Sequence, residues 1–390
     1  MKHISIYLLL LLVFSTCKNE EPNKESKNES KKVNIMAYYV PSNALEVSNL
    51  PLDKLTHIIY SFTEVIDHQM AFTSDRHSKS LEALTKECEK YPDLKVMVAC
   101  GGWGGSGGFS DMAATPENRK IFVDSVVEFL KKYDLDGLDL DWEYPGLRGI
   151  GNTYRPEDKE NFSSLVKELR LAMNQLKPGL LITFAAAGWE RYFEHIELDK
   201  VMKEVDFINL MTYDLAGGIP LTNHHTNLYA KSYDQLDQEV KTALKDNDIE
   251  FQSRSANDIT KFCIEHGVDP SQIIIGGAFY GRSWLGVPPK ENGLHKSHNG
   301  IKSAHSYTSI KQMMLDDPNY IRYWDEQSMA PFIYNKIDSM FITYDDVESL
   351  TLKTRYVKDQ KLGGIMFWQL SQDTEDNELV NAIYQEAAKN

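Results

Sequence analysis

The sequence is short of cysteine and of positive charge, and each shortage excludes a class of protein. Only 4 of its 390 residues are Cys. Cys88, Cys100 and Cys263 stand singly and far apart, which is typical of small buried side chains rather than of a disulfide framework or a metal site. Asp and Glu number 57 against 42 Lys and Arg, a formal net charge of −15. Because a nucleic-acid-binding surface needs clustered Lys and Arg, nucleic acid is not an expected partner.

The apolar run at the N-terminus, Ile4 to Phe14, is too short to span a bilayer comfortably. It follows the basic Lys2, so we interpret residues 1–16 as a signal peptide. Cys17 comes directly after the small residues Ser15 and Thr16, an arrangement that resembles a bacterial lipobox. The resemblance implies that Cys17 is lipidated and becomes the first mature residue.

Residues 18–32 are charged and polar and show no apolar periodicity. We therefore expect residues 17–32 to form the lipidated end and a flexible tether. Glu20 and Glu21 lie soon after Cys17, which resembles the surface-export signal of some bacterial lipoproteins. The expected location is the bacterial outer membrane, contacted through a lipid anchor only, and exposure at the cell surface is a hypothesis.

Short apolar segments recur along the rest of the chain, with helical patterns such as Pro116–Tyr133 and Pro156–Gln175 between several of them. Eight strands alternating with helices predict a (β/α)₈ TIM barrel over residues 33–390. The alternative, an open doubly wound sheet, would want a phosphate-binding Gly turn where Tyr38-Tyr-Val-Pro41 stands. The predicted strands are Val33–Val40, His57–Val65, Leu94–Cys100, Leu135–Glu143, Leu180–Ala187, Asp206–Tyr213, Gln272–Tyr280 and Gly363–Leu370.

The interval between the seventh and eighth predicted strands is about 80 residues, too long for a simple crossover. Residues 283–341 are rich in Tyr, Asn, Gly and Pro and include strand-like runs at Ala330–Tyr334 and Met340–Tyr344. We interpret them as a small α+β lobe inserted between strands seven and eight. A long irregular loop is the alternative, but such loops are uncommon at that length.

The segment from Asp136 to Tyr144 concentrates acidic residues on one face of a predicted strand. Side chains alternate across a strand, so its acids share a face that points into the barrel and its large apolar residues meet the helices. Burying three carboxylates costs free energy, so stability alone would not select them; a metal-binding or solvated acidic strand is the alternative. The acids are Asp139, Asp141 and Glu143, and the apolar residues are Leu138, Leu140 and Trp142.

The spacing of these acids indicates how they act. Same-face neighbours lie about 6.6 Å apart along a strand, so mutual repulsion should keep at least one proton in the cluster at neutral pH. Glu143 is nearest the C-terminal end of the strand, where the active sites of barrel enzymes lie. Glu143 is therefore the predicted proton donor to a leaving oxygen.

The motif Asp136-x-x-Asp-x-Asp-x-Glu143 matches the DxxDxDxE signature of family 18 glycoside hydrolases. The resemblance covers nearly all of the chain after residue 33. Met211-Thr-Tyr-Asp214, Phe279-Tyr-Gly-Arg-Ser-Trp284 and Phe367-Trp-Gln369 end the sixth, seventh and eighth predicted strands, as in that family. The inserted lobe before Thr343-Tyr-Asp-Asp346 resembles the lobe of chitinases, especially the bacterial ones.

The resemblance implies a chitinase with a retaining, substrate-assisted reaction and no metal or other cofactor. Glu143 would protonate the glycosidic oxygen while the acetamido oxygen of the substrate attacks the anomeric carbon and forms an oxazolinium intermediate. Asp141 would hold the acetamido N–H, Asp139 would share a proton with Asp141, and Tyr213 would orient the acetamido carbonyl. The implied partner is chitin or a chitooligosaccharide, and the protein is expected to be a monomer.

The resemblance also implies residues that contact the sugar chain. Trp368 would form the hydrophobic floor under one sugar, and Trp103 would stack on a sugar on the aglycone side, with plain packing as the alternative. Arg282 would contact sugar or play a structural role. The complete predicted set of binding residues is Tyr38, Gly102, Trp103, Tyr144, Met211, Asp214, Tyr280, Arg282 and Trp368.

One departure from the family pattern concerns the segment after the third strand. Family members usually carry Ser-x-Gly-Gly there, and this chain has Ala99-Cys-Gly-Gly102. That Ser normally helps to hold the first acid of the cluster, here Asp139, so one hydrogen bond is expected to be missing. Tyr38 is the residue that we expect to supply another.

Two other functions are alternatives to a chitinase. An endo-β-N-acetylglucosaminidase would cut N-glycans, but such relatives generally lack the inserted lobe. A non-catalytic chitin-binding lectin would typically have lost the catalytic Glu or its Asp partners, and this chain keeps Asp139, Asp141, Glu143 and Tyr213.

Overall fold

The computed structural model describes residues 33–41, 46–217 and 220–389. The predicted signal peptide, the lipidation of Cys17 and the predicted tether fall outside the described residues. In the part of the chain that is described, no helix combines the length and the apolarity needed to cross a membrane.

Eight parallel strands close into a barrel, which confirms the predicted fold class. The strand order is β1-β14-β8-β7-β6-β5-β4-β2, and β1 pairs with β2 to complete the ring. A short strand, β3 (Gln69–Ala71), adds an antiparallel hairpin to β2 that the sequence did not predict. The barrel strands are β1 (Asn34–Tyr39), β2 (His57–Ile66), β4 (Lys95–Gly101), β5 (Gly137–Asp141), β6 (Leu181–Ala187), β7 (Phe207–Met211), β8 (Ile273–Ala278) and β14 (Gly364–Trp368).

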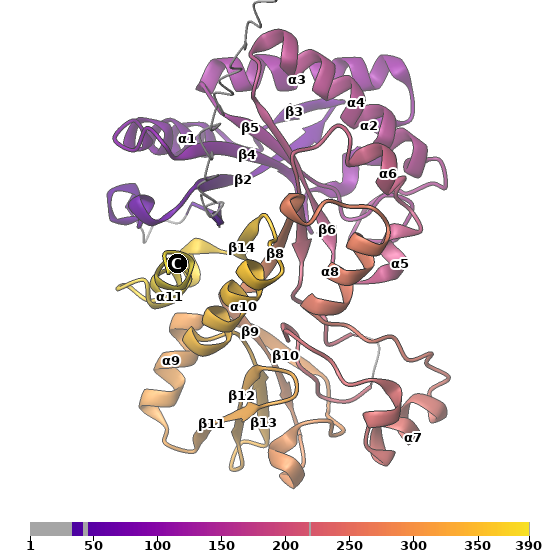
Figure 1. Ribbon diagram of the computed structural model, residues 1–390, viewed down its shortest axis with the longest axis vertical. Coiled ribbons are helices and arrows are strands. Elements are labelled where there is room, and N and C mark those ends of the chain that lie inside the picture. The colour runs from indigo at the N-terminus through magenta and orange to yellow at the C-terminus, as the bar shows by residue number, and fades with distance from the viewer. Residues whose placement is uncertain (1–32, 42–45, 218–219, 390) are drawn as a thin grey trace, which may run out of the picture. The chain divides into compact units, whose positions relative to one another are not determined.

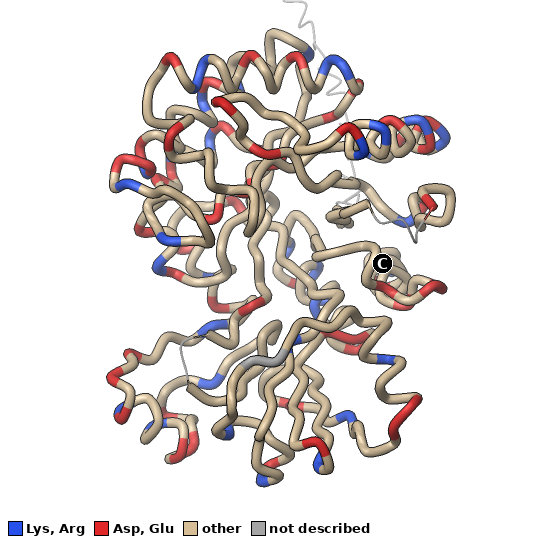
Figure 2. The backbone as a smooth tube through the Cα atoms, turned by 180° about the vertical axis from the view of Figure 1, so that it is seen from behind, with Lys and Arg blue, Asp and Glu red and all other residues tan. Residues whose placement is uncertain are grey.

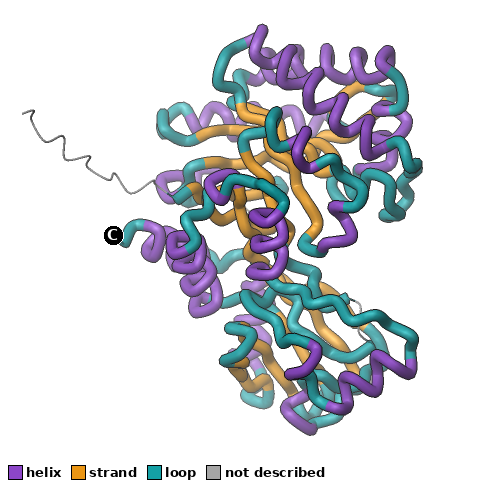
Figure 3. Tube along the Cα trace, turned by 45° about the vertical axis from the view of Figure 1, so that its right-hand side comes forward, coloured by secondary structure: helices purple, strands orange, loops and turns teal. Residues whose placement is uncertain are grey.

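Helices surround the barrel strands (Figures 1 and 3), and their ends follow local sequence rules. In α3 the side chain of Thr115 accepts a hydrogen bond from the Asn118 backbone N–H, and Pro116 occupies the first turn. Figure 2 shows acidic and basic residues alternating along the outer helices. The helices are α1 (Asp75–Cys88), α2 (Phe109–Ala113), α3 (Pro116–Tyr133), α4 (Asp158–Leu176), α5 (Glu190–Phe193), α6 (Leu198–Val201), α7 (Gln238–Asp246), α8 (Ala256–Glu265), α9 (Tyr307–Asp316), α10 (Val347–Asp359) and α11 (Glu378–Ala387).

The two faces of each barrel strand enter different cores. On β1, Ile35, Ala37 and Tyr39 pack in the large cluster between strands and helices, while Met36 and Tyr38 pack in a smaller cluster inside the barrel. This is the period-2 alternation of a strand. The same alternation on β5 directs its leucines to the helices and its acids to the interior, as predicted.

A five-stranded antiparallel sheet lies between β8 and β14 in the sequence, and α9 connects two of its strands, β10 and β11 (Figure 1). The order of its strands is β10-β9-β13-β12-β11. In the sequence these strands lie between Tyr280 and Thr343. The predicted seventh strand, Gln272–Tyr280, corresponds to β8, and β9 begins at Tyr280, directly after Phe279, whose ring centroid lies 4.1 Å from that of Phe367. The bounds are β9 (Tyr280–Leu285), β10 (Ile301–Ser306), β11 (Tyr320–Asp325), β12 (Ala330–Asn335) and β13 (Met340–Thr343).

A second long connection, between β7 and α8, was not recognised in the sequence. It contains α7 and buries its own small apolar cluster of Leu221, Leu236, Val240 and Leu244. Lys296, from the segment between β9 and β10, forms an ion pair with Glu239 of α7 at 2.9 Å. This connection therefore packs beside the antiparallel sheet and contributes to the wall of the site described next.

Candidate active site

The three acids of the β5 segment are buried at the C-terminal end of the barrel. Asp139 is fully buried, and the exposed fractions of Asp141 and Glu143 are 5% and 8%. Trp142, between them, packs outward in the cluster under the helices. The geometry thus brings the three predicted carboxylates together on the inner face, in surroundings that remove most of their water.

Asp139 lies lowest and is held by neutral hydrogen-bond donors. Tyr38 donates to one of its carboxylate oxygens at 2.9 Å. Thr183 of β6 and Asn209 of β7 donate to the other at 2.5 and 3.1 Å. Burial raises the pKa of Asp139 to about 6, although these three hydrogen bonds oppose the rise. Thr183 on β6 and Asn209 on β7 therefore supply hydrogen bonds to Asp139 that Ala99 cannot supply.

Thr183 and Asn209 were not identified from the sequence. Each is a lone polar residue in an otherwise apolar strand, and each side chain is fully buried. A polar residue in such a strand needs a partner inside the protein, and that was the available signal. Its meaning depended on the register that places Asp139 beside Thr183, which sequence alone does not supply.

Asp141 lies between its two acidic neighbours. Burial, and then the charges of Glu143 and Asp139, raise the pKa of Asp141 well above its usual value. Its Oδ1 is buried and has no hydrogen-bond partner among the described residues. An unpaired buried carboxylate oxygen is costly, so this atom is positioned for a donor that arrives with a ligand.

Glu143 is nearest the opening. Burial raises the pKa of Glu143 to about 7, a hydrogen bond with Tyr144 lowers it, and the charge of Asp214 raises it. Its backbone N–H donates to the hydroxyl of Ser106 at 2.9 Å, and that hydroxyl also lies 3.0 Å from the Asp141 carbonyl oxygen. Ser106, which sequence reasoning missed, therefore fixes the end of the acidic strand.

Tyr213 and Asp214 face this cluster from the end of β7. Asp214 adopts a left-handed backbone conformation, with φ of 57°, that is rare outside glycine. Two hydrogen bonds of 2.7 Å tie its carboxylate to Arg282, and His225 Nδ1 lies 3.6 Å away. Burial alone would raise the pKa of Asp214, but His225 and Arg282 hold it well below the usual range. Arg282 thus lines the cleft and also holds Asp214.

A cleft of about 920 Å³ opens above these residues. Trp368 stacks on Phe62 with ring centroids 5.5 Å apart, and half-exposed Trp103 lies 6.3 Å from the Tyr144 ring. Eleven predicted residues line the cleft: Tyr38, Trp103, Asp141, Glu143, Tyr144, Met211, Tyr213, Asp214, Tyr280, Arg282 and Trp368.

Two predicted site residues do not line the cleft. Asp139 lies beneath it, and Gly102 sits under the ring of Phe62 with its N–H donating to the Asp141 carbonyl at 2.8 Å. Gly102 has φ of 83°, and a Cβ there would come within 2.7 Å of that ring. Gly102 therefore shapes the site through its backbone rather than through contact with a ligand. Within the described ranges, no group of three or more His, Cys, Asp or Glu could hold a metal ion.

Residues 34–373 match the model of glycosyl hydrolases family 18. The chain belongs to this family. Chitinase A1 of Niallia circulans is 34% identical over 307 residues, which cover 75% of this chain and 43% of that protein. The chain thus spans less than half the length of that relative.

Two solved structures resemble this one over almost their whole length. A structure described as a family 18 N-acetylglucosaminidase from Paenibacillus barengoltzii has a TM-score of 0.79 at 32% identity, covering 91% of this chain and 99% of the other. The Group IV chitinase of Ostrinia furnacalis has a TM-score of 0.81 at 26% identity, covering 92% and 100%.

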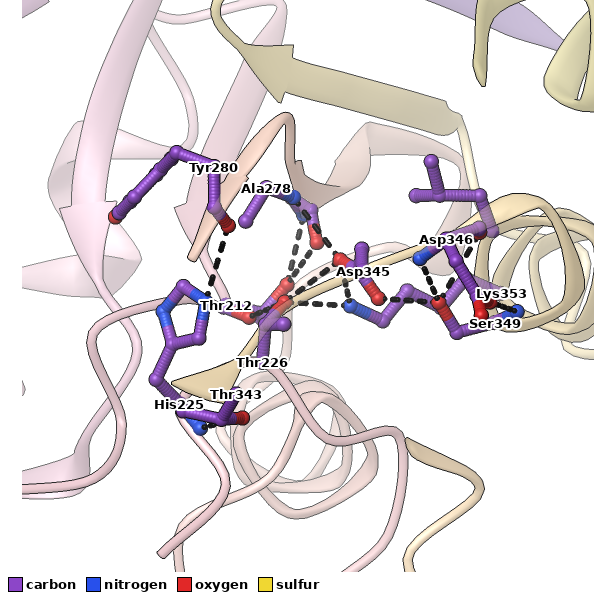
Figure 4. Close-up of polar contacts among 12 residues, drawn as sticks. Thr212, His225, Thr226, Ala278, Tyr280, Thr343, Asp345, Asp346, Ser349 and Lys353 are labelled. Carbon is purple, nitrogen blue, oxygen red and sulfur yellow. Dashed lines mark hydrogen bonds and ion pairs between the residues drawn. The ribbon is translucent and has the colours of Figure 1, made fainter. Parts of the chain in front are cut away.

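Behind the family 18 cleft, a buried ion pair joins the barrel to the antiparallel sheet (Figure 4). Lys353 and Asp345 are both fully buried and lie 2.6 Å apart. Asp345 also accepts hydrogen bonds from the Ala278 N–H of β8 and from the hydroxyl of Thr226, at 3.0 and 2.8 Å. Thr226 follows His225, so the network fixes the segment that approaches Asp214.

Other lining residues of this family 18 site were missed in the sequence. They come from the strand ends and from the two long connections, where no pattern distinguishes a cleft residue from a surface residue. They include Phe62, Trp189, Arg254, Trp284, His298 and Gln372.

Proposed function

We propose that this family 18 protein is a chitinase that hydrolyses β-1,4 bonds between N-acetylglucosamine units of chitin or chitooligosaccharides. The observation that carries the proposal is the buried Oδ1 of Asp141, beside Glu143, which has no hydrogen-bond partner among the described residues. The acetamido N–H of an N-acetylated sugar is a donor of the kind this oxygen lacks. A substrate without the acetyl group would leave it unpaired.

In the proposed reaction Glu143, whose pKa is about 7, donates its proton to the glycosidic oxygen. The carbonyl oxygen of the acetamido group attacks the anomeric carbon as that bond breaks, forming an oxazolinium ring. Asp141 accepts the acetamido N–H and balances the positive charge of the ring. Glu143, now a carboxylate, takes a proton from water, and the water opens the ring with net retention of configuration.

Tyr213 and Asp139 have supporting roles in this proposal. Tyr213 is almost fully buried at the end of β7, where its hydroxyl would hold the acetamido carbonyl in line for attack. Asp139 would take up a proton from Asp141 as charge develops, since burial keeps the pKa of Asp139 near 6. Trp368 would support the reacting sugar from below, and Trp103 and Tyr144 would contact the departing chain.

The experiment compares chitohexaose with the hexamer of glucosamine, which has the same linkage without acetyl groups. We expect cleavage of chitohexaose with initial formation of the β-anomer, observed by NMR, and cleavage of the glucosamine hexamer at least about a thousandfold slower. Equal rates on the two hexamers would contradict the substrate-assisted mechanism. Cleavage of high-mannose N-glycans without action on chitohexaose would replace the chitinase with an endo-β-N-acetylglucosaminidase.

The same experiment addresses a second candidate function. The Paenibacillus barengoltzii relative is described as an N-acetylglucosaminidase, and this chain covers 99% of it. Release of single N-acetylglucosamine units from chitohexaose would favour that activity, whereas disaccharides and longer products would favour a chitinase.

The location remains a separate proposal, because Cys17 lies outside the described residues. We propose that Cys17 carries the lipid and that residues 18–32 tether the barrel to the outer membrane. Membrane fractionation of cells that express the wild type or Cys17→Ser tests this. The wild type should sediment with membranes and the variant should not; sedimentation of both would contradict lipidation.

A further inference from the structure

Arg254 brings to the wall of the cleft a positive charge that has no anionic partner among the described residues. It lines the cleft directly before α8, and its guanidinium carbon lies 5.7 Å from the centre of the Trp189 ring. Burial without a compensating anion lowers the pKa of Arg254. Within the described ranges its guanidinium forms no hydrogen bond or ion pair, and its one contact of this kind is with Trp189.

Other partly buried arginines in the described residues have carboxylate partners. Arg119 pairs with Glu168 at 2.9 Å, and Arg282 pairs with Asp214 at 2.7 Å. A partly buried charge without a partner costs free energy, so an unpaired guanidinium at a cleft is unusual on stability grounds. The Trp189 ring offsets part of this cost, and a bound anionic acceptor would offset more.

The position of Arg254 is fixed by the surrounding structure. Its carbonyl oxygen accepts a hydrogen bond from the Asn227 side chain at 3.0 Å, and the next helix starts with Ala256 N–H donating to the Asn227 carbonyl at 3.1 Å. The Ser255 side chain caps α8 by accepting from the Asp258 N–H. The backbone is therefore held, and the side chain lies on a large aromatic surface.

The guanidinium stands at the end of an aromatic row. Trp103 lies 6.3 Å from Tyr144, and Tyr144 lies 5.4 Å from Trp189, measured between ring centroids. Tyr144 directly follows Glu143, so the row leads away from the acid along the side assigned to the departing chain. Arg254 would thus meet a group on the aglycone part of the substrate.

We propose that Arg254 is a specificity-determining residue that binds a carboxylate carried by the aglycone part of the substrate. The inference rests on the proposed hydrolysis of N-acetylglucosaminides. The planar guanidinium matches a carboxylate with two parallel hydrogen bonds. Among the described residues that line the cleft, the other charged groups are Asp141, Glu143 and the Asp214–Arg282 pair, and none of them is a free cation. The Trp189 end of the cleft is therefore the place that accepts an anion.

Two kinds of sugar present such a carboxylate. One is the aldonic acid at the oxidised reducing end of a chitooligosaccharide. The other is N-acetylmuramic acid, whose lactyl ether carries a carboxylate. The two share the chemistry that Arg254 recognises, and separate substrates distinguish them.

The experiment measures kcat/KM of the full chain on three tetramers that differ only in the unit at the reducing end. These are chitotetraose, its reduced alditol, which is open-chain and neutral, and its oxidised aldonic acid, which is open-chain and anionic. We expect the aldonic acid to be cleaved about tenfold faster than the alditol, since a charge-assisted hydrogen bond changes a rate constant by that order. The preference should shrink as salt is raised, because the site is open to solvent.

Arg254→Gln should reduce the ratio of aldonic acid to alditol to about one. The matched control is Arg191→Gln, which removes the same charge from an exposed residue of α5 that does not line the cleft. It should keep the wild-type ratio. Arg254→Lys should retain part of the preference, because the charge remains and the fork geometry is lost.

A second arm uses the tetrasaccharide of alternating N-acetylglucosamine and N-acetylmuramic acid. An Arg254-dependent gain on this substrate alone assigns the carboxylate to the muramyl sugar, and a gain on the aldonic acid alone assigns it to the oxidised end. A wild type without preference in either arm, or a preference that survives in Arg254→Gln, overturns the proposal. Failure to cleave chitotetraose itself would instead refute the proposed function, so the two failures are distinguishable.

Discussion

Two groups of carboxylates in the described residues, one on β5 and one behind and beside the cleft, have different partners. On β5, Asp139 has neutral hydrogen-bond donors as partners, whereas one buried oxygen of Asp141 has no partner among the described residues. In the region behind the cleft, Asp345 is paired with Lys353, and at its edge Asp214 is paired with Arg282. The ion pairs of the described residues include no partner for the β5 acids.

The difference separates carboxylates that exchange protons from carboxylates that hold a charge. Burial without a cation raises the pKa of Asp139 to about 6 and that of Glu143 to about 7. Arg282 and His225 hold the pKa of the partly exposed Asp214 well below its usual range. The first arrangement suits proton transfer near neutral pH, and the second suits fixed geometry.

Among variants of the β5 acids, which exchange protons, Glu143→Gln should reduce activity most. Gln cannot donate the proton, so kcat on chitotetraose should fall by about a thousandfold or more, while the shape of the cleft is kept. Binding of chitotetraose, followed by tryptophan fluorescence, should survive. A near-normal rate with an intact circular dichroism spectrum would remove Glu143 from the role of acid.

Lys353→Met should destabilise the second group of carboxylates, because it removes the cation that pairs with Asp345. It leaves Asp345 buried and unpaired, so the free energy of unfolding in urea should fall by about 3–5 kcal/mol. The double variant Lys353→Met/Asp345→Asn should recover part of this loss, because it removes the orphaned charge. The exposed pair Lys120–Asp124 provides the control: Lys120→Met should cost at most about 0.5 kcal/mol. An equal loss of unfolding free energy at both pairs would contradict the larger stabilisation that we assign to the buried Lys353–Asp345 pair.

The pH dependence should follow the raised pKa of Glu143. The acid must be protonated, so kcat/KM should fall as pH rises through about 7, by about tenfold per unit above it. Tyr144→Phe should move this limb to higher pH, since the hydrogen bond with Tyr144 lowers the pKa of Glu143. Rates from pH 5 to pH 9 measure the limb, and a flat profile to pH 9 would contradict the assignment.

The same raised pKa values make a prediction for stability. The folded protein binds more protons than the unfolded chain between the ordinary pKa of a carboxyl, about 4, and the folded values near 6 to 7. The contribution of Asp139 and Glu143 to stability is therefore present below that window and is lost as pH rises through it. Urea titrations at pH 5 and pH 8 of the wild type and Asp139→Asn measure it: the variant should lose less stability over this range.

The smallest expected effects compare two positions around Asp139. Thr183→Val removes a donor 2.5 Å from its carboxylate at nearly constant volume, so the pKa of Asp139 should rise further and kcat should fall by about tenfold. Ala99→Ser restores the residue usual in the family, but Asp139 already has three donors here, so kcat should change less than about twofold. A larger effect at Ala99 than at Thr183 would reverse this account.

Much of the fold and of the site could be predicted from the sequence because both rest on short-range patterns. The period-2 alternation of the β5 segment was enough to place three acids inside a barrel and three large apolar residues outside. The lobe between β8 and β14 was visible as an interval too long for a crossover. The connection that carries α7 was not, because its apolar residues form a small cluster without a regular period.

What the sequence by itself determined is the set of groups at the end of β5 and their order toward the opening, since alternation and strand direction are local properties. What only the tertiary structure decided is the set of partners that each group meets. Thr183 and Asn209 reach Asp139 through strand register, and Arg254 reaches Trp189 from a connection that is distant in the sequence. The physical reason is that a pKa or a binding preference depends on distance and burial, which are settled only when remote segments pack together.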